Sequence, residues 1–174
     1  MTGVMRLGAL ALTLLLAGVG LAGCSKPASD TSSSATGAPT TLDGRKVATV
    51  PVTVTTAQGK HVFHVEPART TAEQAQGLMY RTDLKPDGGM LFAPYPPEGG
   101  GPRVAEFWMK NTPTSLDILF IRADGSIARI AENTPPFSEG KIPSGEPVAA
   151  VLELVGGRAA ELGISEGDSV SWPR

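Results

Sequence analysis

Two acidic residues stand within apolar runs of the sequence and are the first candidates for chemistry. Asp117 lies in the run LDILFI (residues 116–121), and Glu153 lies in VLEL (residues 151–154). A carboxylate on an apolar strand face must be paired, hydrogen-bonded or neutralised, because an unpaired buried charge is strongly unfavourable. If both side chains face one pocket, Asp117 and Glu153 would suit acid–base hydrolysis of the kind that glycosidases perform.

The same two carboxylates also have a structural interpretation, which we favour. Arg81 and Lys110 are natural ionic partners for them, and a structural ion-pair network perturbs pKa values without any catalysis. Alternatively, Asp117 accepts hydrogen bonds from the amides of a loop. The sequence therefore singles out no catalytic residue. The alternative hypothesis is a hydrolase that acts on an envelope polymer, with Asp117 and Glu153 as its acid–base pair.

The segment FWMKNT, residues 107–112, is the second candidate site. In a regular strand the side chains alternate between faces, so Trp108 and Lys110 would point one way and Phe107 and Met109 the other. An aromatic plane beside an ammonium group suits a sugar, the end of an acyl chain or an acidic group. The candidate ligand-binding residues are thus Arg81, Trp108, Lys110, Asn111, Thr112 and Asp117.

A purely structural role for this segment is the alternative that we consider more common. Trp108 would then belong to the core, with Lys110 extending past it to water. Asn111 and Thr112 would shape a turn through hydrogen bonds between side chain and backbone.

The sequence points to no metal or cofactor. His61 and His64 are three residues apart on an expected strand, so their side chains should project to opposite faces, and the lone cysteine is expected to be occupied. The sequence also contains no G-x-S-x-G motif, no P-loop and no dinucleotide fingerprint followed by a helix.

The N-terminus has the pattern of an export signal. Arg6 precedes an apolar run from Leu7 to Leu16, and the run closes on Leu-Ala-Gly-Cys at residues 21–24. This ending resembles the lipobox of bacterial lipoproteins, in which the cysteine thiol receives diacylglycerol. We therefore expect residues 1–23 to be a signal peptide and Cys24 to be the lipidation site that anchors the chain to a membrane.

The next segment, residues 24–45, carries the lipidated cysteine and is expected to be a disordered linker. Ser, Thr, Ala, Gly and Pro dominate it, and it has no apolar periodicity. Ser25 follows the cysteine, which by resemblance to proteobacterial lipoproteins is no inner-membrane retention signal. We expect an exported protein of the cell envelope, held at the outer membrane and facing the periplasm.

Residues 46–174 are expected to form a single β-rich domain. Alternating segments at 47–55 and 60–66 predict a hairpin, and further strands are expected at 90–92, 104–109, 116–122, 126–131, 148–154 and 169–172. Short helices are expected after the capping box at Thr70–Glu73 and at 158–162. The predicted fold class is mainly β (α+β), a compact and mostly antiparallel barrel or sandwich with one or two short helices.

Six segments in this order give the domain a resemblance to a known family. They are GLMYR (77–81), GGMLF (88–92), FWMKNT (107–112), LDILFI (116–121), VLEL (151–154) and the GI-x-x-GD run (163–168). The set resembles the secreted bacterial and archaeal family called domain of unknown function 192, over about residues 47–171. The resemblance implies one compact β-rich domain, commonly exported, and brings no activity with it. Between GGMLF and FWMKNT lies an insertion-like stretch, residues 94–102, that would form a rim beside any groove.

The charge balance argues against a nucleic-acid partner. The chain has 15 Lys and Arg against 17 Asp and Glu, a formal net charge of −2, and no cluster of basic residues. The sequence thus favours a non-catalytic binding or accessory module with an unknown small-molecule, cell-wall or protein ligand.

Overall fold

The computed structural model describes residues 40–42 and 45–174, which belong to one unit spanning residues 35–174. The expected signal peptide, Cys24 and most of the expected linker lie outside the described residues. The last part of that linker is not disordered: β1 (Thr40–Leu42) pairs antiparallel with β2 (Arg45–Val47). Backbone hydrogen bonding between these two short segments accounts for this difference.

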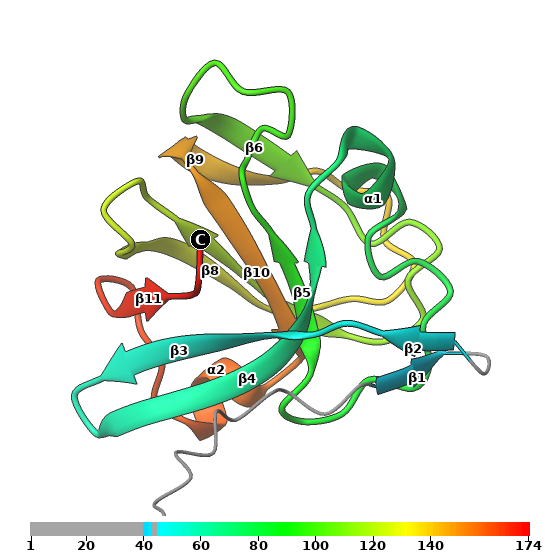
Figure 1. Ribbon diagram of the computed structural model, residues 1–174, viewed down its shortest axis with the longest axis horizontal. Coiled ribbons are helices and arrows are strands. Elements are labelled where there is room, and N and C mark those ends of the chain that lie inside the picture. The colour runs from blue at the N-terminus through cyan, green and yellow to red at the C-terminus, as the bar shows by residue number, and fades with distance from the viewer. Residues whose placement is uncertain (1–39, 43–44) are drawn as a thin grey trace, which may run out of the picture. The chain divides into compact units, whose positions relative to one another are not determined.

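Seven strands form the main sheet, in the order β11-β3-β4-β5-β10-β7-β8 (Figure 1). Neighbours pair antiparallel except β4 and β5, which are parallel. The strands are β3 (Val50–Thr56), β4 (Gly59–Ala68), β5 (Gly89–Phe92), β7 (Leu116–Ile121), β8 (Ile127–Thr134), β10 (Ala150–Val155) and β11 (Ser169–Ser171).

The sheet curls until its two edges meet. Ser126, just before β8, bridges to Ser169 of β11, and the amide of Ile127 donates to the carbonyl of Asp168 at 2.8 Å. The amide of Val170 donates in turn to the carbonyl of Gly125 at 2.8 Å. Curling thus satisfies backbone groups that an open sheet would leave unpaired. The expected barrel-like, mainly β fold is confirmed.

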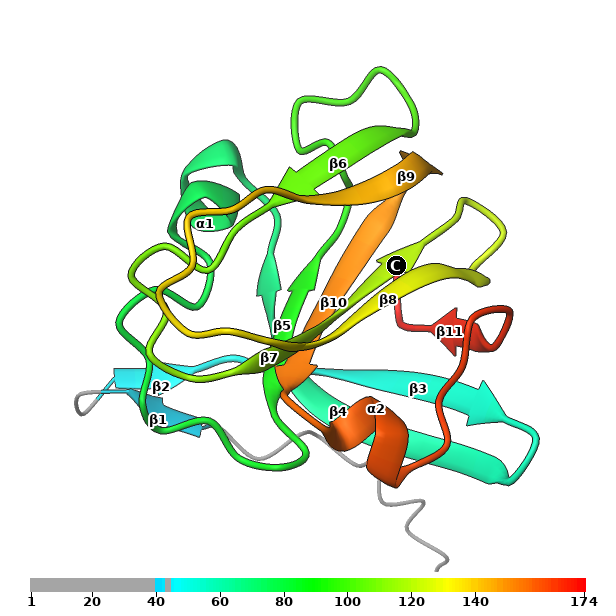
Figure 2. The same ribbon diagram turned by 180° about the vertical axis from the view of Figure 1, so that it is seen from behind.

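A second, two-stranded sheet lies against one face of the first. β6 (Arg103–Phe107) pairs with β9 (Ile142–Val148), a strand that the sequence analysis did not anticipate. Figures 1 and 2 show β6, β9 and helix α1 (Thr71–Gln76) at the end of the main sheet away from helix α2 (Arg158–Glu161). Gly145 and two prolines in β9 hide the usual strand pattern.

Two apolar cores therefore flank the central strands. Leu119, Leu152 and Leu154 face the inside of the curl, whereas Ile118 and Phe120 face the layer that contains β6 and β9. Every residue of β7 is buried as a consequence. A strand that is buried on both faces reads as a continuous apolar run, which is why LDILFI shows no alternation.

Candidate ligand pocket

A pocket of about 290 Å³ opens between the α1 region and the end of β6. We call it the Glu153 pocket; its lining includes Gln74, Met79, Tyr95, Phe107, Trp108 and Glu153. Phe92, Glu106 and Thr112 also reach it. Of the residues singled out in the sequence, the structure brings Trp108, Thr112 and Glu153 together here.

Register places Glu153 at this pocket. On β10 it lies opposite Met90 of β5 and Ile118 of β7, so its side chain shares the face that looks toward β6 and β9. Gly89 permits the close approach of β5. It has φ of +155°, and a Cβ there would lie 2.0 Å from the carbonyl oxygen of Glu153. No side chain fits at that position without separating the two strands.

The carboxyl group of Glu153 is buried, with only 4% of the residue exposed. Desolvation by burial raises its pKa to about 8, and no neighbouring cation or hydrogen bond among the described residues offsets that effect. The expected pairing of Glu153 with Arg81 or Lys110 is therefore wrong. At neutral pH the group is mostly protonated and can donate a hydrogen bond into the pocket.

Trp108 forms the exposed wall of the pocket. β6 ends at Phe107, and Trp108 is 48% exposed, so the interpretation of Trp108 as a core residue is wrong. The ammonium group of Lys110 lies 5.3 Å from the centroid of the Trp108 ring, within the range of a cation–π contact. The predicted juxtaposition of these two side chains is confirmed, although Lys110 itself does not line the pocket.

Asn111 and Thr112 shape the turn that presents Trp108. Asn111 adopts φ of +55°, and its side-chain amide lies 3.9 Å from the sulfur of Met79. Thr112 is buried and its hydroxyl donates to the carbonyl of Lys110 at 3.2 Å. The expected hydrogen bond between side chain and backbone is confirmed for Thr112, whereas the Asn111 side chain contacts another side chain. Thr112 contributes to the pocket wall as well.

Aromatic rings stabilise the inner part of the pocket. The ring of Phe107 packs edge-to-face against two others, with its centroid 5.1 Å from that of Phe92 and 5.9 Å from that of Phe120. The centroid of the Tyr95 ring lies 6.0 Å from that of Phe107. Edge-to-face pairs at these separations are favourable beyond the area they bury. Tyr95 belongs to the insertion-like stretch 94–102, which thus does border a pocket as expected.

Arg81 lies away from this pocket. Its guanidinium bonds Glu66 at 2.7 Å and Asp83 at 2.8 Å, and the residue is only 8% exposed. The two carboxylates raise the pKa of the Arg81 guanidinium, although desolvation opposes them. Its partners satisfy Arg81 within the fold, so it is an ion-pair residue of the β4 side and not a ligand contact of the Glu153 pocket.

Asp117 is also satisfied within the fold. One carboxylate oxygen accepts the amides of Asn133 at 2.8 Å and Gly157 at 3.0 Å, and the other accepts the amide of Ala159 at 2.8 Å. The residue is fully buried. Asp117 does not line the Glu153 pocket, and the expected ionic pairing of Asp117 with Arg81 or Lys110 is wrong. The alternative in which it binds loop amides is confirmed.

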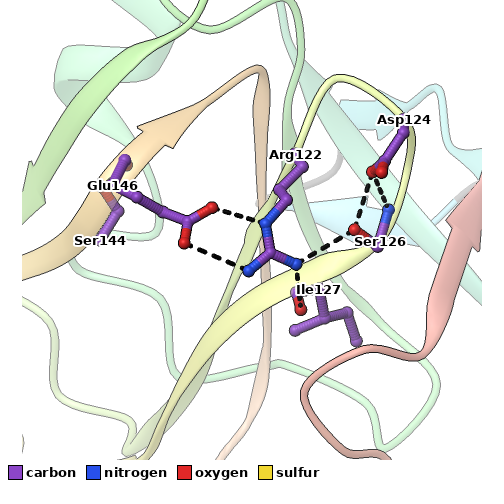
Figure 3. A network of polar contacts seen from close by, with 6 residues as sticks. All are labelled: Arg122, Asp124, Ser126, Ile127, Ser144 and Glu146. Atoms are coloured by element: carbon purple, nitrogen blue, oxygen red, sulfur yellow. Dashed lines mark hydrogen bonds and ion pairs between the residues drawn. The ribbon is translucent and has the colours of Figure 1, made fainter.

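A second hollow, of about 470 Å³, lies elsewhere on the unit, and Pro67, Leu91, Pro94 and Trp172 are among its lining residues. Arg122 also borders it, and Figure 3 shows how that side chain is held. The guanidinium donates to both carboxylate oxygens of Glu146 and to the carbonyl of Ile127. This network ties β9 to the turn between β7 and β8.

Within residues 40–42 and 45–174, no group of three or more His, Cys, Asp and Glu side chains is arranged to hold a metal ion. In the same part of the chain, no helix has the length and apolar character needed to cross a bilayer.

The sequence analysis missed most of the pocket wall. Phe92, Tyr95 and Glu106 come from three separate segments, and the loop after α1 contributes Leu78 and Met79. The available signal for this wall was an aromatic residue, Phe92, before the stretch 94–102 and an acidic residue, Glu106, after it. Nothing in the local pattern shows that these segments converge.

Comparisons with known proteins agree with this architecture. The model of the family DUF192, described as an uncharacterized ACR, matches residues 52–172. The chain belongs to the DUF192 family. A search of curated proteins finds no match.

Two solved structures are similar to this DUF192 protein. A protein of unknown function from Novosphingobium aromaticivorans is 47% identical, with a TM-score of 0.70 over 78% of this chain and 94% of that one. A Sinorhizobium meliloti protein described as a "putative transcription regulator" is 46% identical, with a TM-score of 0.67 over 72% and 95% of the two chains.

Proposed function

We propose that this DUF192 protein is an exported, lipid-anchored module of the cell envelope that binds a ligand in the Glu153 pocket without catalysing a reaction. The Glu153 pocket carries the binding part of the proposal. A buried carboxyl group that has no partner among the described residues is costly to stability, and a ligand that bonds it offsets that cost.

The anchoring part rests on the sequence. A basic residue, an apolar run and Leu-Ala-Gly-Cys stand in the order of a lipoprotein signal, and a segment rich in Ser, Thr and Pro follows Cys24. Two or more acyl chains on Cys24 would make attachment effectively permanent, since each buried methylene contributes about 0.8 kcal/mol. The outer membrane, facing the periplasm, is the destination that Ser25 favours.

Hydrolysis by an Asp117–Glu153 pair has no support, because Asp117 is occupied by three backbone amides. A role in transcription, suggested by the description of the Sinorhizobium protein, is not favoured either. The net charge is −2, and Arg103, Arg122 and Lys141 are each paired with a glutamate. Nucleic-acid binding would need an uncompensated basic surface.

Detergent phase partitioning tests the anchor. The native chain should enter the detergent phase and lack residues 1–23, whereas Cys24→Ser should remain in the aqueous phase or keep its signal peptide. Equal partitioning of both proteins into the aqueous phase would overturn the lipid anchor.

Ligand-observed NMR against fragments of cell wall and membrane lipids tests the pocket. A fragment that binds the native protein should lose its signal change with Trp108→Ala and keep it with Trp172→Ala, which alters an aromatic residue at the second hollow. Binding that is unaffected by Trp108→Ala, or silence across the whole panel, would overturn the assignment of the Glu153 pocket.

A further inference from the structure

The wall of the Glu153 pocket has an unusual chemical composition. Two carboxyl groups, from Glu106 and Glu153, share it with the rings of Phe92, Tyr95, Phe107 and Trp108. None of the described residues that line it is Lys, Arg or His. Carboxyl groups and aromatic faces together, without basic side chains, are the surroundings that an organic cation requires.

We infer that the Glu153 pocket binds an organic cation, an amine or quaternary ammonium group carried on a small apolar body. The inference rests on the proposed function, which makes this pocket a ligand site, and it names the class of ligand. It differs from the expectation that Trp108 and Lys110 together grip an acidic group or a sugar.

The aromatic wall already contacts cations of the chain itself. The ammonium group of Lys110 lies 5.3 Å from the Trp108 ring centroid, and the guanidinium of Arg103 lies 6.0 Å from that of Tyr95. Both rings therefore present their faces to positive charge. A ligand cation has to compete with Lys110 for the Trp108 ring, so Lys110 opposes binding of a cation and would assist binding of an anion.

Glu153 supplies the counter-charge. Burial keeps its carboxyl group protonated, with a pKa of about 8, so the empty pocket is nearly free of buried charge at neutral pH. When a cation enters, the carboxylate form gains a partner and its pKa falls. The O–H bond of Glu153 breaks, the proton passes to solvent, and the carboxylate and the cation remain as a pair.

The other carboxyl groups around Glu153 are already hydrogen-bonded or face away from the pocket, so the released proton comes from Glu153. Glu106, on β6, is exposed and its carboxylate already bonds the ammonium group of Lys141 at 2.6 Å. Glu73, on α1, accepts the amides of Arg69 and Thr70 at 2.8 and 2.9 Å. Asp117, on β7, faces the other side of the sheet. Tyr95 is the remaining titratable group in the wall.

Isothermal titration calorimetry of the full chain in detergent micelles tests the inference. The probes are choline and benzyltrimethylammonium, which carry no titratable proton, and their neutral counterparts 3,3-dimethyl-1-butanol and benzyl alcohol. We expect at least one cation to bind tenfold or more tightly than its neutral counterpart. At pH 7, titrations in buffers of different ionisation enthalpy should show release of up to about one proton per bound cation.

Three variants complete the test. Glu153→Gln should weaken cation binding at least tenfold and abolish proton release, while Glu139→Gln, which removes an exposed carboxylate elsewhere, should change neither. Lys110→Ala should tighten cation binding. Circular dichroism and the unfolding midpoint show whether each variant is folded before its affinity is compared.

The outcomes separate the ligand class from the proposed function. If neither cation binds more tightly than its neutral counterpart, or if Lys110→Ala weakens cation binding, the inference that the ligand is a cation is overturned. When envelope fragments still bind in a manner that depends on Trp108, the Glu153 pocket nevertheless stands as a ligand site. If neither probes nor fragments bind, both proposals are overturned.

Discussion

Asp117 and Glu153 lie on adjacent strands of one sheet and point to opposite faces. In the β7–β10 register, Glu153 is opposite Ile118 and Asp117 is opposite Leu154, one step further along. Side chains of directly paired residues share a face and alternate along the strand, so the sheet itself separates the two carboxyl groups. The Asp117 carboxylate organises the loops at the end of the curled sheet, and the Glu153 carboxyl group reaches the Glu153 pocket.

The three amides bound by Asp117 predict a large loss of stability when its charge is removed. Asp117→Asn places a side-chain NH₂ group against a backbone amide, because an amide side chain has only one acceptor oxygen. We expect the free energy of unfolding to fall by about 2–4 kcal/mol, measured by urea denaturation. The matched change Asp87→Asn, at an exposed position, should cost under about 0.5 kcal/mol. A similar effect for both variants would contradict the structural role of Asp117.

The raised pKa of Glu153 predicts a pH dependence of stability. The pKa of Glu153 is about 8 in the folded protein and about 4.3 in an unfolded chain, so between these values the folded state binds more protons. Stability from this group is fully present below pH about 4.3 and is lost as pH rises through about 8. Burial of the neutral form is tolerated, whereas burial of the charged form is not.

Glu153→Gln should remove that dependence. Relative to the native protein, the variant should gain on the order of 3–5 kcal/mol in free energy of unfolding between pH 5 and pH 9. Chemical denaturation across this range measures it, with Glu139→Gln as the control for a general change in charge. Parallel pH profiles for native protein and Glu153→Gln would show that the carboxyl group is ionised in the fold.

Contact between β5 and β10 predicts that Gly89 tolerates no side chain. Gly89→Ala puts a Cβ 2.0 Å from the carbonyl oxygen of Glu153, at φ of +155°. We expect thermal denaturation to show a loss of about 3 kcal/mol or more, because the strands must separate to relieve the clash. Gly99→Ala, also at positive φ but with nothing within 4 Å, should cost only about 1–2 kcal/mol. Equal losses would mean that backbone strain alone sets the cost.

Exposure of Trp108 predicts that its removal spares the fold. Trp108→Ala should lower the free energy of unfolding by at most about 1 kcal/mol, since the side chain is 48% exposed. Phe107→Ala, which removes a ring packed against three others, should cost about 3–5 kcal/mol. Unfolding of the Trp108 variant would instead support the view that FWMKNT is only a structural block and that any partner docks elsewhere.

The buried pair of Arg81 and Glu66 predicts strong coupling between the two side chains. Arg81→Met alone leaves Glu66 without its ion-pair partner and should cost about 3–5 kcal/mol. The double change with Glu66→Leu should recover much of that loss, because it removes both charges together. Additive losses in a double-mutant cycle would contradict a direct interaction.

Local signals in the sequence predicted much of the fold. The hairpin of β3 and β4, the Asp-Gly turn between β7 and β8, and the capping box of α1 each rest on residues close together in the chain. The Thr70 hydroxyl accepts the amide of Glu73, and the Glu73 carboxylate accepts the amide of Thr70, as the capping box predicts. Such contacts form within a few residues, so their pattern is legible without the tertiary structure.

Prediction was weaker wherever distant segments meet. β9 was missed because Gly145 and its prolines lack strand propensity, and it is held in place by pairing with β6. The linker prediction extended too far, since β1 and β2 pair there. The alternative that placed Trp108 in the core is wrong, because the strand before it ends at Phe107 and its side chain is about half exposed.

By itself the sequence determined the family, the mainly β class and the two carboxyl groups in apolar strands. Only the tertiary structure decided that the two carboxyl groups, Asp117 and Glu153, lie in different surroundings on opposite faces of the sheet. Which amides reach Asp117 and which rings surround Glu153 depends on strand register, and a shift of one residue would exchange the two faces. The register of Glu153 is set by pairing with Met90, 63 residues away in the chain, so no local pattern contains it.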